Sequence, residues 1–525
     1  MATLTGCMEE TFPTSYVSQE QVVQSPKAAS SYAMGMPGIL TQLFFVTSDW
    51  DWDCGNPALM HIRDIMTGDM PIVYSGYDHF TAYEQNMAMG ENYAVVQTVW
   101  NTFTQMIQTA NLTLGAIDPE TEVAINRYYY GAALTYRAMW YLDMAAWYEF
   151  LPNDTFSKNR YGNDVTGLTV PIVTENMGEE EARENPRAPH DRMFEFIIDD
   201  LTKAESYITA AERPAKTMPD LACVYGMKAR AYMWNEDYAK AKEYAEKAIA
   251  AHKGSPTTRA QWLDLQTGFN TLATPSWMWG AEYTSDMPAV IQASILTWTG
   301  WSCNEFNGYA GAGPRLMIDA NLYSKIDDND FRKLTFVAPT GSALAGQENY
   351  VNKAYTNTWP YGPLETYASL KFKPGQGNME NAVPGAVTAY PVMRVEEMYL
   401  IQAEAAAHIS AAEGKNLLES FMKSYRYDTY TCKASDTQGV VDECFLQKRI
   451  ELYGEGRILY DYKRLNKPVI RHYNGSNWNS ETQFNTETRP AWMNFVITRG
   501  EGLNNTAVTE FNNPDTSQCY PVLGE

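Results

Sequence analysis

The chain has 525 residues, of which 45% are hydrophobic and 20% are charged, and this composition is typical of a globular protein. Its 63 acidic residues outnumber the 40 lysine and arginine residues, which gives a formal net charge of −23. Such a surface repels nucleic acid and anionic lipid headgroups and argues against binding to either. The sequence contains no run of 18 apolar residues, so a membrane-spanning helix is not expected.

Two long helices are predicted between residues 93 and 148. Apolar residues at helical spacing predict the first helix over 93–115. These residues are Trp100, Phe103, Ile107 and Leu114. The run Asp118-Pro119-Glu120 supplies an acidic N-cap, a proline at the first helical position and an acid in the first turn. A second helix is therefore predicted from Asp118 to about Tyr148.

The clearest repeat lies between Leu221 and Ala251, where small residues occur at positions at which two paired helices must approach closely. The residues of this pattern are Tyr225, Gly226, Ala229, Ala231, Tyr232, Tyr238, Ala241, Tyr244, Ala245 and Ala248. The pattern approximates a tetratricopeptide unit. A helix predicted at roughly 190–210 and two C-terminal segments would supply further units. Stacking these units gives a core that one pair alone cannot form.

From about 255 to 390 the composition changes, and the same change recurs from about 466 to the end of the chain. Glycine, proline, asparagine and aromatic residues replace the alanine-rich helical periodicity. Loops of this length in a compact protein are usually functional or disordered. Tryptophan and tyrosine gain free energy by burial or by ligand contact, so we expect ordered loops that recognise a ligand. Within them, residues 327–330 are expected to form a turn and a helix cap rather than a cation site.

Two segments near the C-terminus, 394–405 and 447–465, are predicted to be helices that carry charges at spacings of three to four residues. The residues concerned are Arg394, Glu396, Glu404, Glu451, Arg457, Asp461 and Arg464. A catalytic role is one interpretation of these charged residues. Ion pairs that lock adjacent helices account for them better, because an unpaired buried charge is costly.

The runs RVEEMYLIQAEA (394–405) and QKRIELYGEGRILYDYKRL (447–465) together resemble the paired C-terminal signature of the SusD/RagB family. The two helices predicted over 93–148, with Ala110-Asn111 near the end of the first, are similar to the N-terminal pattern of the same family. The resemblance implies a mainly α fold, with a tetratricopeptide-like helical repeat core and long irregular loop insertions. It also implies an outer-membrane lipoprotein that captures a nutrient and hands it to a TonB-dependent transporter.

On this resemblance the chain is expected to form a single domain over 1–525. It would comprise a lipoprotein tether (1–20), a helical-repeat core (85–255 and 390–465) and loop-rich ligand-binding insertions (256–389 and 466–525). Leu4-Thr5-Gly6-Cys7 is similar to a lipobox, and Met8-Glu9-Glu10 is similar to the acidic stretch that directs lipoproteins to the cell surface. Cys7 is therefore the expected lipid attachment site, and the lipid the expected membrane contact.

Motifs of catalysis and of metal binding are absent from the sequence. It has no Gly-x-Ser-x-Gly elbow, phosphate loop or dinucleotide fingerprint, and its six histidines show no metal-ligand spacing. Asp49, Asp51 and Asp53 imitate the start of a calcium loop, but Met60 occupies the position of the bidentate acid. We expect a binding protein that needs no cofactor and no metal.

The seven cysteines form no Cys-x-x-Cys motif. Cys432 and Cys444 flank a polar loop and are candidates for a disulfide outside the cytoplasm. An unpaired buried thiol is equally compatible with the other cysteines.

Aromatic residues in the insertions are the candidate ligand site. Sugar rings present apolar C–H faces that stack on flat aromatic rings, while their hydroxyls need polar partners at the edge. In the resembled family the glycan site is a surface arc of aromatic residues on such insertions. The candidate stacking residues are Trp298, Trp301 and Tyr309 in a glycine-rich insertion and Trp50, Trp52 and Tyr77 in the N-terminal loops, where Tyr83 also lies. Asn304 and Asp49 are candidate hydroxyl partners. Most of the other rings are expected to belong to the core.

The sequence thus predicts a SusD-like surface lipoprotein that binds oligosaccharide without cleaving it. Its helical-repeat face would dock on a SusC-like TonB-dependent transporter in the outer membrane. One alternative is a RagB-like member that carries peptide, since an acidic surface steers cationic peptides. Another is a secreted glycoside hydrolase with a helical core, because the many acids provide possible carboxylate pairs.

Overall fold

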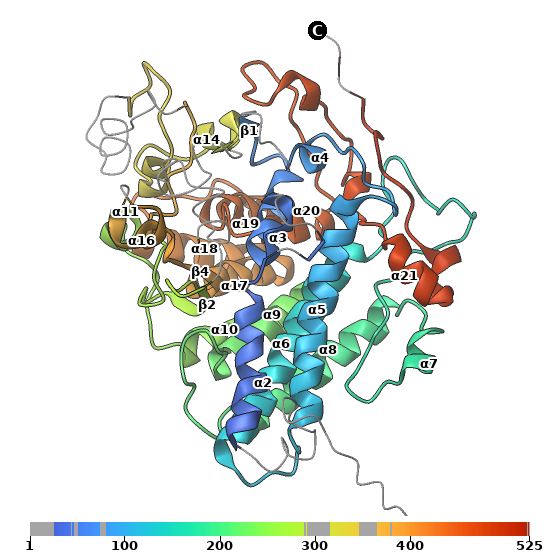
Figure 1. The fold of residues 1–525 in the computed structure, drawn as a ribbon. Helices are drawn as coiled ribbons and strands as arrows, with labels where there is room; N and C mark the ends of the chain where they lie inside the picture. The colour runs from blue at the N-terminus through green and yellow to red at the C-terminus, as the bar shows by residue number, and fades with distance from the viewer. Residues whose placement is uncertain are drawn as a thin grey trace, which may run out of the picture.

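The computed structural model describes residues 26–43, 45–46, 51–73, 80–287, 290, 315–345, 365–378, 381–521 and 523. Helices dominate this part of the chain and pack side by side (Figure 1). The long helices are α2 (Pro26–Ile39), α5 (Ala94–Ala116), α6 (Ala124–Tyr148), α8 (His190–Tyr207), α9 (Leu221–Trp234), α10 (Tyr238–Ala251), α17 (Val395–Ile409), α18 (Ala411–Tyr425) and α19 (Thr437–Glu451). The prediction of a mainly α, tetratricopeptide-like fold is confirmed.

The long helices pack in an order that largely follows the chain. Helix α5 contacts α6, α6 contacts α8, α8 contacts α9, and α9 contacts α10. Helix α10 then packs directly on α17, although more than 140 residues separate the two in sequence (Figure 1). Helix α17 in turn contacts both α18 and α19. The long segment between α10 and α17 therefore leaves the stacking of the helices uninterrupted.

Small residues allow these helices to approach closely, as the repeat pattern predicts. A Cβ atom on Gly131 of α6 would lie 2.8 Å from the Cβ atom of Tyr207 on α8, and one on Gly414 of α18 would lie 2.5 Å from Ala407 of α17. On α10, Ala241, Ala245 and Ala248 are fully buried. A side chain larger than hydrogen or methyl at these contacts would push the helices apart.

Helix α5 has the predicted bounds to within one residue, but α6 begins at Ala124 rather than at Asp118. The Asp118 side chain accepts a hydrogen bond from the backbone N–H of Glu120 at 2.9 Å, and the Thr121 N–H donates to the Asp118 carbonyl oxygen at 3.1 Å. These bonds form a turn that ends the α5–α6 connection. Asp118 thus stabilises the turn before α6 and not the first turn of the helix.

The predicted helix over 447–465 is two helices. Helix α19 ends at Glu451, and α20 (Ile458–Arg464) follows a tight turn. Gly454 and Gly456 have positive φ angles of 79° and 65°, which favour glycine. A Cβ atom on Gly456 would also lie 2.5 Å from the Cα atom of Met60. The turn therefore brings the chain against α3 (Gly55–Ile65) and redirects α20 along it.

A short antiparallel pair of strands closes the ends of the long insertion. Strand β2 (Trp277–Glu282) pairs with β4 (Ala389–Arg394), and Glu282 lies opposite Ala389. Strands β1 (Ile72–Val73) and β3 (Arg315–Leu316) form a second pair. The remaining short helices are α4 (Thr81–Glu84), α7 (Glu179–Ala182), α11 (Arg259–Leu263), α14 (Ala320–Ser324), α16 (Ala382–Ala386) and α21 (Arg499–Asn504). The 3-10 helices are η1 (Asp51–Asp53), η3 (Phe331–Thr335), η4 (Gly375–Gly377), η5 (Ser480–Thr482), η6 (Ala491–Met493) and η7 (Thr506–Phe511).

Most of the described tryptophans belong to the core, as expected for the majority of rings. The fully buried ones are Trp140, Trp147, Trp262, Trp277, Trp279 and Trp492. Many make edge-to-face contacts, for example Trp279 with Tyr136 at a centroid distance of 4.6 Å. Such pairs stabilise a core beyond the burial of their area.

Cys432 and Cys444 are buried free thiols, so the candidate disulfide between them is not formed in this structure. Both side chains pack in a small apolar cluster with Leu418 and Phe421, between α17, α18 and α19. There they act as small hydrophobic side chains, a common role for cysteine. Asn329 and Asp330 behave as predicted: the Asn329 N–H donates to the Asp327 side chain, and Asp330 caps η3.

Candidate functional site

The predicted site residues fall mainly outside the described residues. These are Asp49, Trp50, Tyr77, Trp298, Trp301, Asn304 and Tyr309, together with Cys7. Trp52 is described, and 2% of its surface is exposed because it packs in the core beside α3. Its neighbour in the predicted cluster, Tyr83, is 1% exposed and donates a hydrogen bond to the Val95 carbonyl oxygen. Neither ring offers a face to a ligand, which corrects the assignment of Trp52 to the binding site.

A cleft of about 770 Å³ lies between α5, α6, the segment 171–183 and α21. Small-molecule sites commonly enclose about 300–1,000 Å³, so the cleft can accommodate an oligosaccharide unit or a short peptide. Its lining includes Tyr32, Trp100, Thr104, Ile107, Gln108, Asn111, Leu112, Tyr141, Met144, Val173, Thr174, Glu175, Met177, Glu179, Arg183, Glu501, Asn504 and Asn505.

Hydrogen bonds hold the walls of this cleft in place. The Tyr141 hydroxyl on α6 donates to the Val173 carbonyl oxygen at 3.0 Å, and Asn111 on α5 donates to the same oxygen at 2.9 Å. On the opposite side, the Asn505 side chain donates to the Asn185 carbonyl oxygen at 2.6 Å and accepts from the Asn185 N–H at 3.1 Å. These hydrogen bonds thereby hold three distant segments of the sequence around the cleft.

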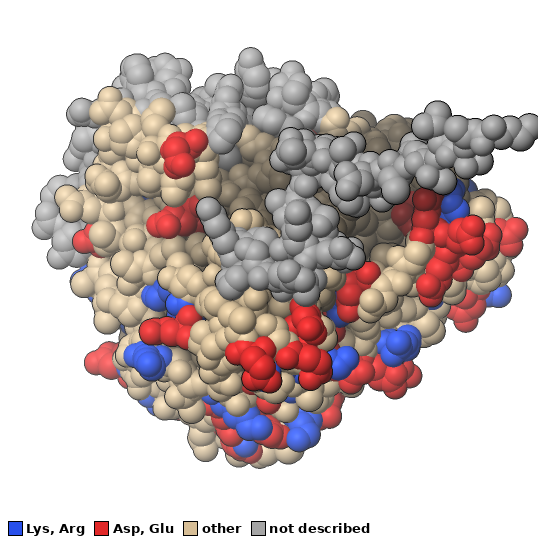
Figure 2. All heavy atoms as spheres, turned by 60° about the horizontal axis from the view of Figure 1, so that its bottom comes forward, with Lys and Arg blue, Asp and Glu red and all other residues tan. Residues whose placement is uncertain are grey.

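The lining of the cleft combines apolar side chains with an acidic rim. Leu112 and Val173 expose apolar surface, while Glu175, Glu179 and Glu501 supply carboxyl groups. Burial raises the pKa of Glu501. Figure 2 shows acidic side chains gathered at the side of the molecule where α7 lies, and the first turn of α7 consists of Glu179, Glu180 and Glu181. Glu175 pairs with Arg137 and Glu179 pairs with Arg183, so the acidic character comes mainly from the surrounding surface. The cleft suits neutral or cationic ligands with both apolar and hydrogen-bonding parts.

The charges of the C-terminal signature form ion pairs, and the first network is centred on Glu451. This carboxylate accepts hydrogen bonds from Arg332 at 2.9 Å, from Arg394 at 3.1 Å and from Arg426 at 2.7 Å. The side chains of all four are fully buried. Burial opposes ionisation of Glu451, but the three guanidinium groups outweigh it and hold its pKa well below the ordinary value of 4.5. The network joins η3, β4, α18 and α19.

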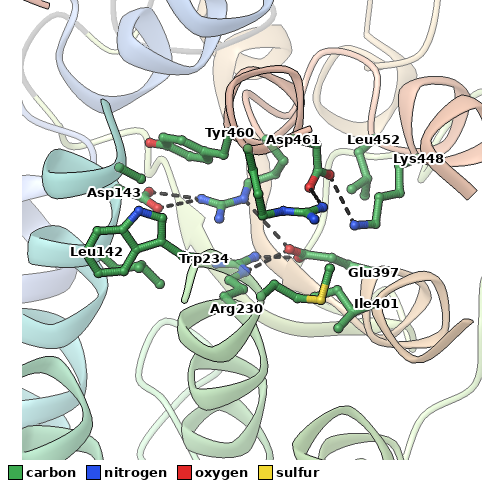
Figure 3. Close-up of a pocket in the computed structure, with 14 residues that line it drawn as sticks. Leu142, Asp143, Arg230, Trp234, Glu397, Ile401, Lys448, Leu452, Tyr460 and Asp461 are labelled. Atoms are coloured by element: carbon green, nitrogen blue, oxygen red, sulfur yellow. Dashed lines mark hydrogen bonds and ion pairs between the residues drawn. The ribbon is translucent and has the colours of Figure 1, made fainter. Parts of the chain in front are cut away.

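A second network joins α6, α9, α17, α19 and α20, and its side chains converge on a small cavity (Figure 3). Arg457 donates to both oxygens of Asp143 at 2.8 and 3.0 Å. Arg230 donates from Nε to Glu397 at 2.8 Å. Lys448 and Arg464 both pair with Asp461 and Glu404. The structural interpretation of the signature charges is thereby confirmed.

Arg457→Ala is expected to destabilise the fold by about 3–5 kcal/mol, because it leaves Asp143 without its hydrogen-bonded partner inside the protein. A lower melting temperature and a lower yield would show this, with ligand affinity unchanged in the protein that folds. Arg192→Ala is a matched control, since Arg192 is exposed on α8 and its pair with Glu195 contributes little. A wild-type melting temperature and yield for Arg457→Ala would contradict the structural role.

Sequence reasoning missed the partners of these networks and the cleft. Asp143 is the single acidic residue of α6, and Arg230 follows Lys228 in the alanine-rich α9. Charged residues in such apolar helices were the available signal of a buried ion pair. The cleft offered no comparable signal, because its walls come from segments that no local pattern connects. Among the described residues, no group of three or more histidine, cysteine or acidic side chains could hold a metal ion.

Two family models match separate halves of the chain. Residues 24–233 match a SusD-like model described as starch-binding and associating with the outer membrane, and residues 319–500 match the model of the SusD family. Together the matches cover more than half of the sequence. The chain belongs to the SusD family. A comparison with curated proteins finds no match.

Solved structures of the SusD superfamily share the fold over nearly the whole chain. A SusD-like carbohydrate binding protein from Bacteroides vulgatus is 22% identical, with a TM-score of 0.71, over 92% of this chain and 97% of its own. A SusD superfamily protein from Bacteroides thetaiotaomicron is 16% identical, with a TM-score of 0.67, over 93% and 99%. A putative sugar binding protein from Bacteroides vulgatus is 19% identical, with a TM-score of 0.66, over 92% and 97%.

The SusD family is associated with the outer membrane, and its members are in general binding proteins rather than enzymes. None of the described helices is both long enough and apolar enough to cross a bilayer.

Proposed function

We propose that this SusD-family chain is a lipid-anchored protein of the cell surface that binds oligosaccharide without cleaving it. The match of both halves to SusD-family models, one of them described as starch-binding, is the observation that carries this proposal. The similarity to a SusD-like carbohydrate binding protein supports it. Cys7 would be acylated and would hold the protein at the outer membrane.

The helical array would serve as a rigid frame for the ligand-binding loops. Buried ion-pair networks lock the helices of the array to one another, so the frame can hold loops in a fixed position. The glycan platform is proposed on the insertions, with Trp298, Trp301 and Tyr309 stacking on sugar rings and Asn304 bonding hydroxyls. Trp50, Tyr77 and Asp49 would extend it from the N-terminal loops.

Capture would be followed by transfer to a SusC-like TonB-dependent transporter. In this proposal the helical-repeat face docks on the transporter, and the protein acts as a hinged lid over it. Ligand enclosed between lid and transporter would be committed to import. The task is capture and release, for which no cofactor is needed.

A peptide is the alternative cargo, and the acidic rim of the cleft beside α7 favours a cationic one. The experiment that separates the two applies the soluble protein to a glycan array and, in parallel, to a pool of basic peptides. We expect saturable binding to a restricted set of glycans and no new reducing ends after incubation with them. Selective peptide binding would replace the carbohydrate proposal, and new reducing ends would replace the non-catalytic one.

A further inference from the structure

The cavity of Figure 3 is lined by side chains from five helices of the array. Its volume is about 60 Å³. One water molecule needs about 10–15 Å³ by the same measure, so the cavity has room for a small ion but not for a sugar unit. The charged side chains that face it are Asp143, Arg230, Glu397, Lys448, Arg457, Asp461 and Arg464. The apolar walls come from Leu142, Ala146, Ile401 and Leu452 among others.

The ion pairs around the cavity leave one positive charge in excess. Lys448 and Arg464 balance Glu404 and Asp461. In the group beside them, three arginines pair with two carboxylates: Arg63 and Arg457 contact Asp143, while Arg230 and Arg457 contact Glu397. The charges in direct contact therefore sum to +1. A buried charge without a counterion is costly.

The neighbouring network around Glu451 has no such excess. Its cations are Arg332, Lys371, Arg394 and Arg426, and its anions are Asp330, Glu396, Glu451 and Glu455. The two networks meet on α17 and α19, where Glu396 and Glu451 belong to the first network and Glu397 and Lys448 to the second, and all four side chains are largely buried. Positive and negative charges are therefore equal in number in the Glu451 network, and the excess positive charge is found only in the network beside the cavity.

Two guanidinium N–H groups at the cavity have no acceptor within hydrogen-bond distance among the described residues. They are Nε of Arg457 and Nη1 of Arg464, although the Tyr238 hydroxyl also interacts with the Arg464 guanidinium group. The Nε atom of Arg457 lies 3.8 Å from the nearer Glu397 oxygen, which is too far for a hydrogen bond. The Arg464 side chain is 6% exposed, so bulk water does not reach most of it. Buried donors of this kind normally have a partner.

We propose that this cavity binds a small monovalent inorganic anion, such as chloride, between Arg457 and Arg464. The anion accepts hydrogen bonds from the unpaired N–H groups of Arg457 and Arg464 and neutralises the excess positive charge. It thereby links α6 of the N-terminal half to α17, α19 and α20 of the signature. The carboxylates of Asp143, Glu397 and Asp461 also line the cavity, and each is already engaged by a cation, which limits their repulsion of the anion.

The first test measures the thermal midpoint of the wild-type protein in sodium chloride and in sodium gluconate at equal ionic strength. Gluconate is too large for the cavity. We expect the midpoint to rise with chloride concentration in the manner of a bound ligand and to stay unchanged with gluconate. Crystals grown in sodium bromide should show an anomalous peak in the cavity. Equal midpoints in the two salts, with no bromide peak, would mean that water alone fills the cavity and would overturn the proposal.

Two matched variants test whether Arg457 is responsible for the response of the thermal midpoint to chloride. Arg457→Lys retains the positive charge and removes the Nε–H group, and we expect at least a tenfold weaker response to chloride. Arg137→Lys alters a buried arginine on α6, the helix that carries Asp143, and it should keep the wild-type response because Arg137 pairs with Asp200 and Glu175 away from the cavity. Equal responses in the two variants would contradict the assignment. If Arg457→Lys does not fold, the bromide peak of the wild-type protein decides.

Discussion

Glu451→Ala is expected to lower the free energy of unfolding by at least about 3–5 kcal/mol. The substitution removes the carboxylate that three buried guanidinium groups share, and it leaves Arg332, Arg394 and Arg426 with an unbalanced charge. Urea unfolding followed by far-UV circular dichroism measures the loss. A variant that unfolds within 1 kcal/mol of the wild type would show that the network contributes little.

Glu195→Ala is the matched control for this loss. Glu195 is exposed on α8 and pairs with the exposed Arg192, so its removal should cost less than about 1 kcal/mol. Acidification provides a second readout. Because the folded-state pKa of Glu451 is lowered, its contribution is complete above the ordinary value of 4.5 and is lost as the pH falls below it. The stability difference between wild type and Glu451→Ala should shrink accordingly.

The double variant Trp298→Ala/Trp301→Ala is expected to abolish most of the glycan affinity. Loss of one large aromatic contact costs about 1–3 kcal/mol, and each 1.4 kcal/mol is a tenfold change in the dissociation constant. Isothermal titration with a glycan selected on the array measures the effect. Tyr161→Ala is a suitable control, since Tyr161 is an exposed ring outside the insertions and should not affect binding.

Unchanged affinity in the double variant would place the glycan site elsewhere. The cleft between α5, α6 and α21 is then the next position to test, through Gln108→Ala and Leu112→Ala. Both side chains are exposed on α5, so these substitutions should leave the fold intact. A loss of affinity there, and none at the tryptophans, would assign recognition to the cleft.

The sequence was sufficient to predict the helical array because its helices carry local signals. Alanine and glycine at helical spacing indicated α9 and α10, and apolar residues at helical spacing indicated α5. The start of α6 was wrong because an N-cap pattern and an Asp turn share the same residues at 118–121. The break between α19 and α20 was missed, although Gly454 and Gly456 marked it, because the charges continue at helical spacing across them.

The candidate site could be predicted less well, because its contacts join residues that are far apart in the sequence. Asn111, Asn185 and Asn505 shape the cleft together but lie far apart in the sequence, and no local pattern joins them. The ion pairs were foreseen as a structural feature of the signature. Their partners Asp143 and Arg230 come from the N-terminal half, so pairing required three-dimensional information.

The pairing of β2 with β4 has a consequence for how such proteins diversify. Glu282 and Ala389 lie opposite each other, so the chain between them departs from and returns to a single point, while α10 stays in contact with α17. Lengthening a segment whose ends are held together adds little entropic penalty, about 0.6 kcal/mol for each doubling. Residues can therefore be added to this segment away from Arg332 and Lys371, which belong to the buried Glu451 network, and the protein acquires a new specificity without rebuilding its scaffold.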